Sequence, residues 1–268
     1  FEVDAADTAS QILFAGCRFT LAGVLAAGIG SVMEGCFLRP ERKAAKEIIW
    51  LSLLQTIIQY FFFYMGLAHT SGVKASIIEA VNVFIAILVA GFLFHQEKIT
   101  SRKITGCILG FAGVVLINLN GMNFQFSLAG EGAIFFSTIA YAFSSVFVKK
   151  FSQKFNPVML SAYQFIIGGI VLMAAGGVMG GHITKVTLSG IGLLVYLALV
   201  SAVAYSLWGI LLKYNPVSRV TVFGFMNPVF GVLLSALLLG ETDQASGILG
   251  LLSLLLVSVG IYVVNSGK

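Results

Sequence analysis

The chain has 268 residues, of which 58% are hydrophobic and only 10% are charged, and its formal net charge is +5. A soluble domain usually carries about a quarter of its residues as charged side chains, so this composition excludes an ordinary soluble protein. Long apolar runs that lack the alternating polar residues of a membrane β-barrel predict helices that span a lipid bilayer.

Nine apolar runs are predicted as membrane spans. In chain order they cover residues 10–32, 47–67, 73–94, 102–119, 130–149, 157–179, 187–211, 217–239 and 245–264. Two runs begin at an Asn-Pro pair, Asn156-Pro157 and Asn215-Pro216, which is typical of a helix start because Asn caps free N–H groups and Pro fits the first turn. The chain is therefore predicted to be an all-α polytopic membrane protein.

An internal repeat relates the two halves of the chain. Tyr60 and Tyr205 are separated by 145 positions, and Asn82 and Asn227 are separated by the same 145. The segment AGCRFTLAG, which contains Arg18, also aligns with SAYQFIIGG in the second half. Duplicated apolar segments on this scale are typical of transporters built from two related bundles.

The repeat predicts two domains, residues 1–120 and residues 130–268. The first contains four predicted helices and the second five, so we expect a ten-helix protein in which one helix precedes residue 1. A removed signal peptide is the alternative, and it would leave the two bundles unequal. Five helices per repeat also imply that the two repeats have inverted topology.

Basic residues gather in one set of alternating links. Thirteen of the 16 Lys and Arg residues lie there or at the C-terminus, whereas the opposite links contain only Lys74 and Lys185. The positive-inside rule then predicts a multi-pass protein of the plasma (inner) membrane with a cytoplasmic C-terminus. The scattered basic links form no continuous groove, so no nucleic-acid partner is expected. The expected partners are the bilayer and a small-molecule solute, and a homodimer stays open.

Several motifs resemble one known family. FAGCRFTLAG, the run that ends FLFHQE at Glu97, and FGFMNPVFGVLLSALLLGE, which ends at Glu241, resemble the EamA repeats of the drug/metabolite transporter superfamily. The resemblance covers nearly the whole chain and implies ten helices in two inverted repeats. It also implies a secondary transporter of small metabolites, most often an exporter of amino acids or related solutes, with import left open.

Two charged residues lie deep inside predicted spans rather than near their ends. Counted at 1.5 Å per residue from the same side, Glu79 is about 10 Å deep and Arg18 is about 12 Å deep. Charges at such depth are costly in hydrocarbon, so both are expected to face the bundle interior or water. Their matching depth predicts an Arg18–Glu79 ion pair. Either this pair is purely structural, or Glu79 couples transport to protons or binds a cationic group of the substrate.

Polar and aromatic side chains inside the apolar runs are candidates to line a solute cavity, in which amides orient the solute and rings cover its apolar part. The candidates are Gln55, Gln59, Tyr60, Tyr64, Glu79, Asn82, Tyr141, Ser144, Tyr205, Trp208, Asn227 and Pro228. The alternative is interhelical hydrogen bonding, worth only about 1 kcal/mol for each bond. Pro228 is expected to kink its helix and to free the Gly224 carbonyl, for substrate contact or only for packing.

Other features favour structural roles. The pairs Gly106 with Gly110 and Gly176 with Gly180 are expected to let helices approach closely. Glu97 and Glu241 are predicted to be capping or gate-lining groups. The sequence contains no HExxH motif and no intramembrane Asp, so no metal, no cofactor and no enzymatic activity are expected. A non-transporting scaffold or accessory subunit is the alternative to a transporter, and an intramembrane enzyme is less favoured.

Overall fold

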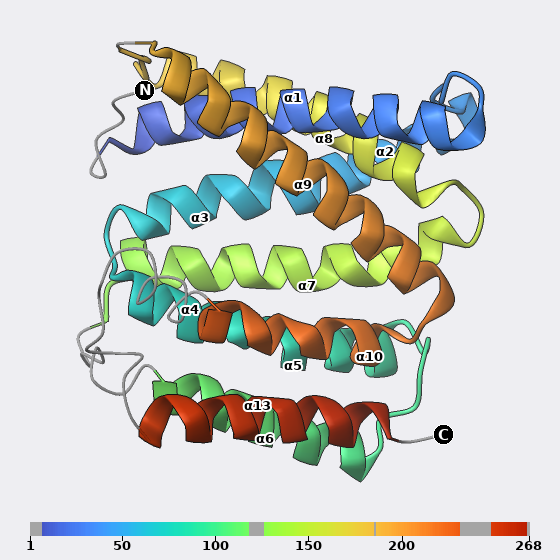
Figure 1. The fold of residues 1–268 in the computed structure, drawn as a ribbon, viewed down its shortest axis with the longest axis vertical. Coiled ribbons are helices and arrows are strands. Elements are labelled where there is room, and N and C mark those ends of the chain that lie inside the picture. The colour runs from blue at the N-terminus through green and yellow to red at the C-terminus, as the bar shows by residue number, and fades with distance from the viewer. Residues whose placement is uncertain (1–6, 118–125, 185, 231–247, 267–268) are drawn as a thin grey trace. The chain divides into compact units, whose positions relative to one another are not determined.

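The computed structural model describes residues 7–117, 126–184, 186–230 and 248–266. Regular structure in this part of the chain is helical, and the order of the helices is given in Figure 1. The main elements are α1 (Thr8–Glu34), α2 (Ala45–Leu51), α3 (Gln59–Leu67), α4 (Gly72–Ala80), α5 (Asn82–Leu88), α6 (Ser101–Ile117), α7 (Ala133–Ser152), α8 (Pro157–Val178), α9 (Leu188–Tyr214), α10 (Val217–Thr221) and α13 (Ile248–Asn265).

Short helices of other kinds extend several of these elements. They are the 3-10 helices Arg42–Ala44 and Val222–Phe225 and the π-helices Ser52–Ile58, Val89–Leu93 and Leu128–Gly132. Six combined helices among the described residues are long and apolar enough to cross a membrane, and α13 is a shorter apolar helix. The predicted all-α polytopic membrane fold is confirmed, although the predicted span 217–239 is described only to residue 230 and Glu241 lies outside the described residues.

The chain forms two compact units, and each unit draws on both halves of the sequence. Unit 1 consists of Phe1–His69 and Phe147–Tyr214, and unit 2 consists of Thr70–Val146 and Asn215–Lys268. In unit 1 the segments α1 to α3 pack with α8 and α9. In unit 2 the segments α4 to α6 pack with α10 and α13. Equivalent helices of the predicted repeats therefore share one compact unit.

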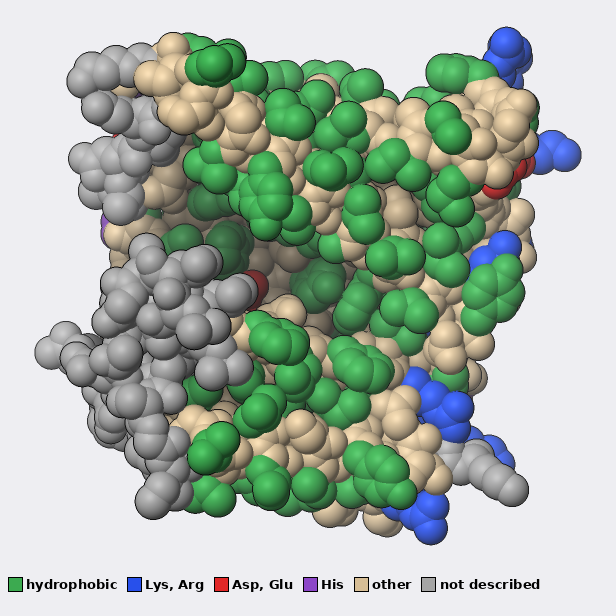
Figure 2. Space-filling view, viewed as in Figure 1, with side chains coloured by type: hydrophobic (Ala, Val, Ile, Leu, Met, Phe, Trp, Pro, Cys, Tyr) green, Lys and Arg blue, Asp and Glu red, His purple; other side chains and the backbone are tan. Residues whose placement is uncertain are grey.

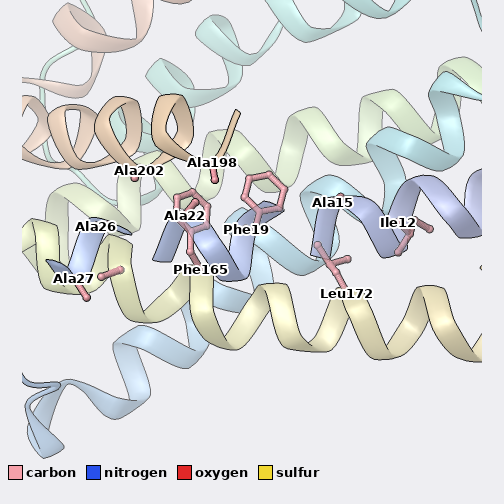
Figure 3. Close-up of a cluster of buried hydrophobic side chains, with 11 residues drawn as sticks. Ile12, Ala15, Phe19, Ala22, Ala26, Ala27, Phe165, Leu172, Ala198 and Ala202 are labelled. Atoms are coloured by element: carbon pink, nitrogen blue, oxygen red, sulfur yellow. The ribbon is translucent and has the colours of Figure 1, made fainter. Parts of the chain in front are cut away.

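The core of unit 1 lies between α1, α8 and α9, as Figure 3 shows. Helices α1 and α8 run antiparallel and approach so closely that a Cβ built on Gly23 would lie 2.5 Å from the Ala162 carbonyl oxygen. A Cβ on Gly169 would likewise lie 2.9 Å from the Gly16 carbonyl oxygen. Small residues at these positions allow the two backbones to touch, which is the usual way in which helices associate in a bilayer.

The core of unit 2 is built around α6 and α13. A Cβ on Gly106 would lie 2.7 Å from the Gly260 carbonyl oxygen, and Gly110 faces Gly260 and the Phe225 ring. The predicted close approach at Gly106 and Gly110 is therefore confirmed. The prediction for Gly180 is wrong: this residue has φ +87° in the turn after α8, and a Cβ there would meet nothing within 4 Å.

Helix starts were predicted at two Asn-Pro pairs, and the structure gives a different outcome for each. Asn156 caps α8 by accepting hydrogen bonds from the Val158 and Met159 amides, at 2.8 and 3.2 Å, which confirms the first prediction. At the second pair a helix does begin, at Val217, but the N-cap residue of α10 is Pro216 rather than Asn215. The amide group there is satisfied instead by Glu97, which accepts from Ser218 N at 3.0 Å and from Ser218 Oγ at 2.6 Å.

Glu97 is thus a capping group, as predicted, although it caps a distant helix rather than its own. Its side chain is only 6% exposed and also pairs with Lys103 Nζ at 2.7 Å. The carboxylate therefore ties the start of α6 to the start of α10 inside unit 2. A negative charge at a helix N-terminus is favourable because it faces unsatisfied N–H groups.

Basic residues gather at one end of unit 1. The Asn156 side chain donates to Glu34 at the end of α1, and Lys149 Nζ donates to the Leu212 carbonyl oxygen at 3.0 Å. These contacts bring the basic link 39–46 to the same end as Lys150. In Figure 2, hydrophobic side chains cover the helix surfaces and Lys and Arg side chains project at helix ends.

Candidate functional site

Four aromatic rings meet in the middle of unit 1. The Phe19 and Phe165 rings stack with centroids 5.1 Å apart, and Tyr60 Oη lies 2.6 Å from Tyr205 Oη. The Phe19 ring also packs on Tyr60 at 4.2 Å, as the Phe165 ring does on Tyr205 at 4.8 Å. Phe19 aligns with Phe165 and Tyr60 with Tyr205 in the repeat. The Phe19–Phe165 and Tyr60–Tyr205 contacts therefore join equivalent residues. The other two contacts, Phe19–Tyr60 and Phe165–Tyr205, are equivalent to each other, as a local twofold axis requires.

Two polar pairs flank the rings and obey the same symmetry. Arg18 donates to Ser201 Oγ through Nη2 at 2.8 Å and Nε at 3.2 Å. Thr56 Oγ1 donates to Gln164 Oε1 at 2.8 Å. The alignment pairs Arg18 with Gln164 and Thr56 with Ser201. The two halves of the cluster thus have one architecture but different charge, since only the first repeat places a cation there.

The guanidinium of Arg18 is held in one orientation. Ser201 Oγ donates to the Leu197 carbonyl oxygen at 2.9 Å, so its lone pairs are left to accept both Arg18 N–H groups. The Arg18 Cζ atom lies 4.9 Å from the Phe19 ring centroid, which is a cation–π distance. Among the described residues, the ion pairs are Lys74–Glu131 and Lys103–Glu97, and neither includes Arg18.

The predicted candidates Gln55 and Gln59 are both buried, with 2% and 6% exposure. Gln55 lies in the π-helix Ser52–Ile58, and its Oε1 accepts from Gln164 Nε2 at 3.2 Å. Gln55 Nε2 and Gln59 Oε1 have no hydrogen-bond partner among the described residues. Single π-helical turns are frequent at functional sites, and an unpaired buried amide can accept a solute or water contact.

Tyr64 and Trp208 lie beside this cluster. The Tyr64 ring is 6.3 Å from the Tyr60 ring, and its hydroxyl interacts with Arg18. Trp208 is half-buried on α9, three residues after Tyr205. Unit 1 therefore contains seven of the predicted candidates, which are Arg18, Gln55, Gln59, Tyr60, Tyr64, Tyr205 and Trp208. These residues stay candidates, because the geometry establishes proximity and not transport.

In unit 2 the candidates lie at helix irregularities. Helix α4 ends at Ala80 and α5 begins at Asn82, whose side chain is 4% exposed and whose Oδ1 has no partner among the described residues. Asn227 is exposed and Pro228 is buried. The helix before Pro228 changes to 3-10 geometry over Val222–Phe225, as an interior proline would favour.

Glu79 is exposed on α4 of unit 2. Arg18 belongs to unit 1, so the predicted Arg18–Glu79 ion pair joins two separate units and stays a prediction. On α7, the Ser144 and Ser145 hydroxyls both donate to the Tyr141 carbonyl oxygen, at 2.7 and 3.2 Å. Both serine hydroxyls therefore donate their hydrogen bonds within their own helix.

Sequence reasoning missed several members of the cluster. Phe19, Phe165, Thr56, Gln164 and Ser201 were not named as candidates, although the alignment of AGCRFTLAG with SAYQFIIGG already pairs Phe19 with Phe165 and Arg18 with Gln164. It also missed the ion pair between Lys74 and Glu131, at 2.8 Å in unit 2. The described residues contain no group of three or more His, Cys, Asp or Glu side chains suited to a metal ion.

Comparisons with known proteins agree with this architecture. The model of the EamA-like transporter family matches residues 4–119 and 128–266. An uncharacterized transporter of Archaeoglobus fulgidus is 30% identical over 266 residues, which cover 95% of this chain and 88% of that protein. The uncharacterized inner membrane transporter YedA of Escherichia coli K12 is 29% identical, covering 94% of this chain and 83% of that protein. A solved crystal structure, 19% identical, has the same fold with a TM-score of 0.79 over 94% of this chain and 87% of its own.

Proposed function

The chain belongs to the EamA-like transporter family, and from this premise we propose that it is a secondary transporter of small organic metabolites, such as amino acids or related solutes. It works by alternating access, in which the inverted halves of the protein exchange their roles. Membrane transport is the function that its relatives are named for. The identity of the solutes, the mechanism and the direction, which we propose to be export, go beyond those names.

The observation that carries the proposal is the local symmetry of unit 1. Tyr60 contacts its own repeat equivalent Tyr205, and the Arg18–Ser201 pair has its counterpart in Gln164–Thr56. Inverted repeats that meet across such an axis support two states of similar energy, because exchanging the two halves reproduces the same contacts. Alternating access requires two such states.

The orientation that we propose places the C-terminus in the cytoplasm. It is supported by the basic link 39–46 and Lys150, which lie at one end of unit 1. Short loops rich in Lys and Arg remain on the cytoplasmic side during membrane insertion. The sequence contains no Walker A motif, so we propose that a solute or ion gradient drives transport.

Counterflow in proteoliposomes tests the proposal. The purified full-length protein is reconstituted, loaded with one unlabelled metabolite at a time, and supplied with the same labelled compound outside. A transporter accumulates label transiently above the level of protein-free liposomes. Accumulation with no member of a broad metabolite panel would favour a scaffold or accessory subunit, and chemical conversion of a compound would identify an enzyme.

A further inference from the structure

Arg18 has more hydrogen-bond donors than its contacts with Ser201 use. A guanidinium has five N–H groups, and the contacts with Ser201 use one on Nε and one on Nη2. The remaining three are the two on Nη1 and one on Nη2. One N–H on Nη1 and one on Nη2 form the end-on edge of the fork, which has the geometry to bind a carboxylate through two parallel hydrogen bonds. The Tyr64 hydroxyl also interacts with Arg18.

The charge of Arg18 is not required for packing. Its equivalent Gln164 occupies the matching position in the other repeat, is fully buried and bonds the matching hydroxyl of Thr56. A neutral amide therefore suffices for the interhelical hydrogen bond at this place in the fold. Arg18 is instead half-buried. A cation retained inside a membrane protein at an energetic cost is typical of a functional site.

The aromatic environment on the Arg18 side is also richer. Tyr64 lies beside Tyr60 and interacts with Arg18, whereas its equivalent in the second repeat is Gly209, which packs on Pro157. A cation next to aromatic rings in unit 1, which has no ion-pair partner among the described residues, suits a ligand that has an anionic group and an apolar body. The rings would cover the body while the guanidinium neutralises the charge.

We propose that Arg18 binds a carboxylate group of the transported solute, through two N–H groups on its Nη1–Nη2 edge, with Tyr60 and Tyr64 covering the apolar part. Ser201 is a positioning residue, because it accepts from Arg18 Nε and Nη2 and so fixes the orientation of the fork. This inference rests on the proposed transport function, because it takes the ligand to be the transported solute. The binding of the carboxylate itself can be measured without transport.

Binding in detergent tests the carboxylate site directly. The probes are matched pairs of a carboxylate and its amide, such as L-phenylalanine with L-phenylalaninamide, L-leucine with L-leucinamide and 3-phenylpropionate with 3-phenylpropionamide. Affinities come from the ligand-induced shift in melting temperature of the purified full-length protein. We expect at least one carboxylate to bind about tenfold or more tightly than its amide, because the amide cannot form the paired charged contact.

Variants assign that preference to Arg18. Arg18→Gln installs the residue that the fold accepts at the equivalent position, so it is expected to fold, to lose about tenfold in carboxylate affinity and to leave amide binding within about twofold. Arg18→Lys keeps the charge but lacks the planar guanidinium, so its carboxylate affinity is expected to lie between those of the unmodified protein and the Arg18→Gln variant. Ser201→Ala should weaken carboxylate binding in the same direction, with rescue by Ser201→Thr. Arg39→Gln, the same change at an exposed loop position, is the matched control.

The outcomes separate this inference from the proposed function. If no carboxylate in the panel binds better than its amide, or if Arg18→Gln leaves the preference intact, the carboxylate site is wrong, whether or not transport occurs. If counterflow succeeds only with solutes that lack a carboxylate, the transport proposal stands and the inference falls. If carboxylates bind in an Arg18-dependent way but no solute is moved, the inference stands and the transport proposal falls.

Discussion

Tyr60 Oη lies 2.6 Å from Tyr205 Oη, and these two residues occupy the same position in the two repeats. A hydrogen bond between equivalent residues must lie on the local axis that relates them. Only one hydroxyl can donate in this bond, so a single proton breaks the local symmetry at that point. Exchanging donor and acceptor restores the same bond, which is compatible with the alternating access that we propose.

The tyrosine pair predicts strong coupling between two substitutions. Tyr60→Phe removes the hydrogen bond between the Tyr60 and Tyr205 hydroxyls, and we expect it to lower the free energy of unfolding in detergent by about 1–3 kcal/mol. Tyr205→Phe should have a similar effect. The double variant should be less destabilised than the sum of the two, because both single substitutions remove the same hydrogen bond.

The control for this cycle is Tyr163→Phe, which removes a hydroxyl that donates to the Leu38 carbonyl oxygen at 2.8 Å elsewhere in unit 1. Combined with Tyr60→Phe, it should be additive within about 0.5 kcal/mol. Equal coupling in the two double variants would mean that the Tyr60–Tyr205 contact has no energetic role.

The α1–α8 contact predicts that two glycines of helix α8 differ sharply in how well they tolerate substitution by alanine. A Cβ on Gly169 would lie 2.5 Å from the Thr20 amide nitrogen, which belongs to the backbone and has little freedom to move. Gly169→Ala should therefore destabilise unit 1 by about 1–3 kcal/mol through overpacking. A Cβ on Gly177, in the same helix α8, would meet nothing within 4 Å.

Gly177→Ala should accordingly be neutral or should stabilise the protein by about 0.5–1 kcal/mol, because alanine restricts the unfolded chain and favours a helix. Both effects are read from unfolding in mixed micelles. Equal effects of the two substitutions would show that α1 and α8 do not pack at Gly169.

The carboxylate of Glu97 predicts a capping role that depends on its charge. Glu97→Ala removes the carboxylate that binds Lys103 and the start of α10, while Lys103 Nζ keeps its contact with the Lys98 carbonyl oxygen at 2.8 Å. We expect a loss of about 3–5 kcal/mol in stability. Glu97→Gln should lose less, because its amide oxygen can still accept from Ser218. Glu41→Gln, at an exposed residue whose side chain makes no capping bond, is the control and should change stability by less than about 0.5 kcal/mol.

Comparable destabilisation by Glu41→Gln and Glu97→Gln would remove the special role of Glu97. Loss of amide protection at the start of α10, followed by hydrogen exchange in the Glu97→Ala variant, would locate the effect. Protection that is unchanged there would contradict capping by this carboxylate even if global stability fell.

The proposed orientation predicts which cysteines a membrane-impermeant maleimide reaches. Cys36 is exposed and follows α1 at the basic end of unit 1. With Cys17 and Cys107 replaced by alanine, we expect Cys36 to be labelled in inside-out vesicles and protected in whole cells. Ser189 is exposed near the start of α9, at the opposite end from Lys213.

A Ser189→Cys variant in a background without the native cysteines should show the reverse pattern, with labelling in whole cells. Labelling of Cys36 and of the Ser189→Cys thiol from the same side would contradict a membrane-spanning α9. Labelling of Cys36 only from outside would invert the topology that we propose.

The sequence by itself determined the all-α, membrane-spanning character of the chain and the existence of the repeat. Both are properties of the linear pattern: a span needs about 20 apolar residues in a row, and the 145-residue spacing of Tyr60 and Tyr205 is visible without coordinates. The cap at Asn156 was also predictable, because its hydrogen bonds reach only the next three residues.

Only the tertiary structure decided which distant groups meet. Arg18 bonds Ser201 across 183 positions, and Glu97 caps α10 across 121 positions, where sequence reasoning expected Asn215. It also decided that Gly180 lies in a turn while Gly176 lies against α1. These contacts depend on the rotation and depth of each helix against its neighbours, and helix packing sets them through close backbone approach and burial, which local sequence patterns do not encode.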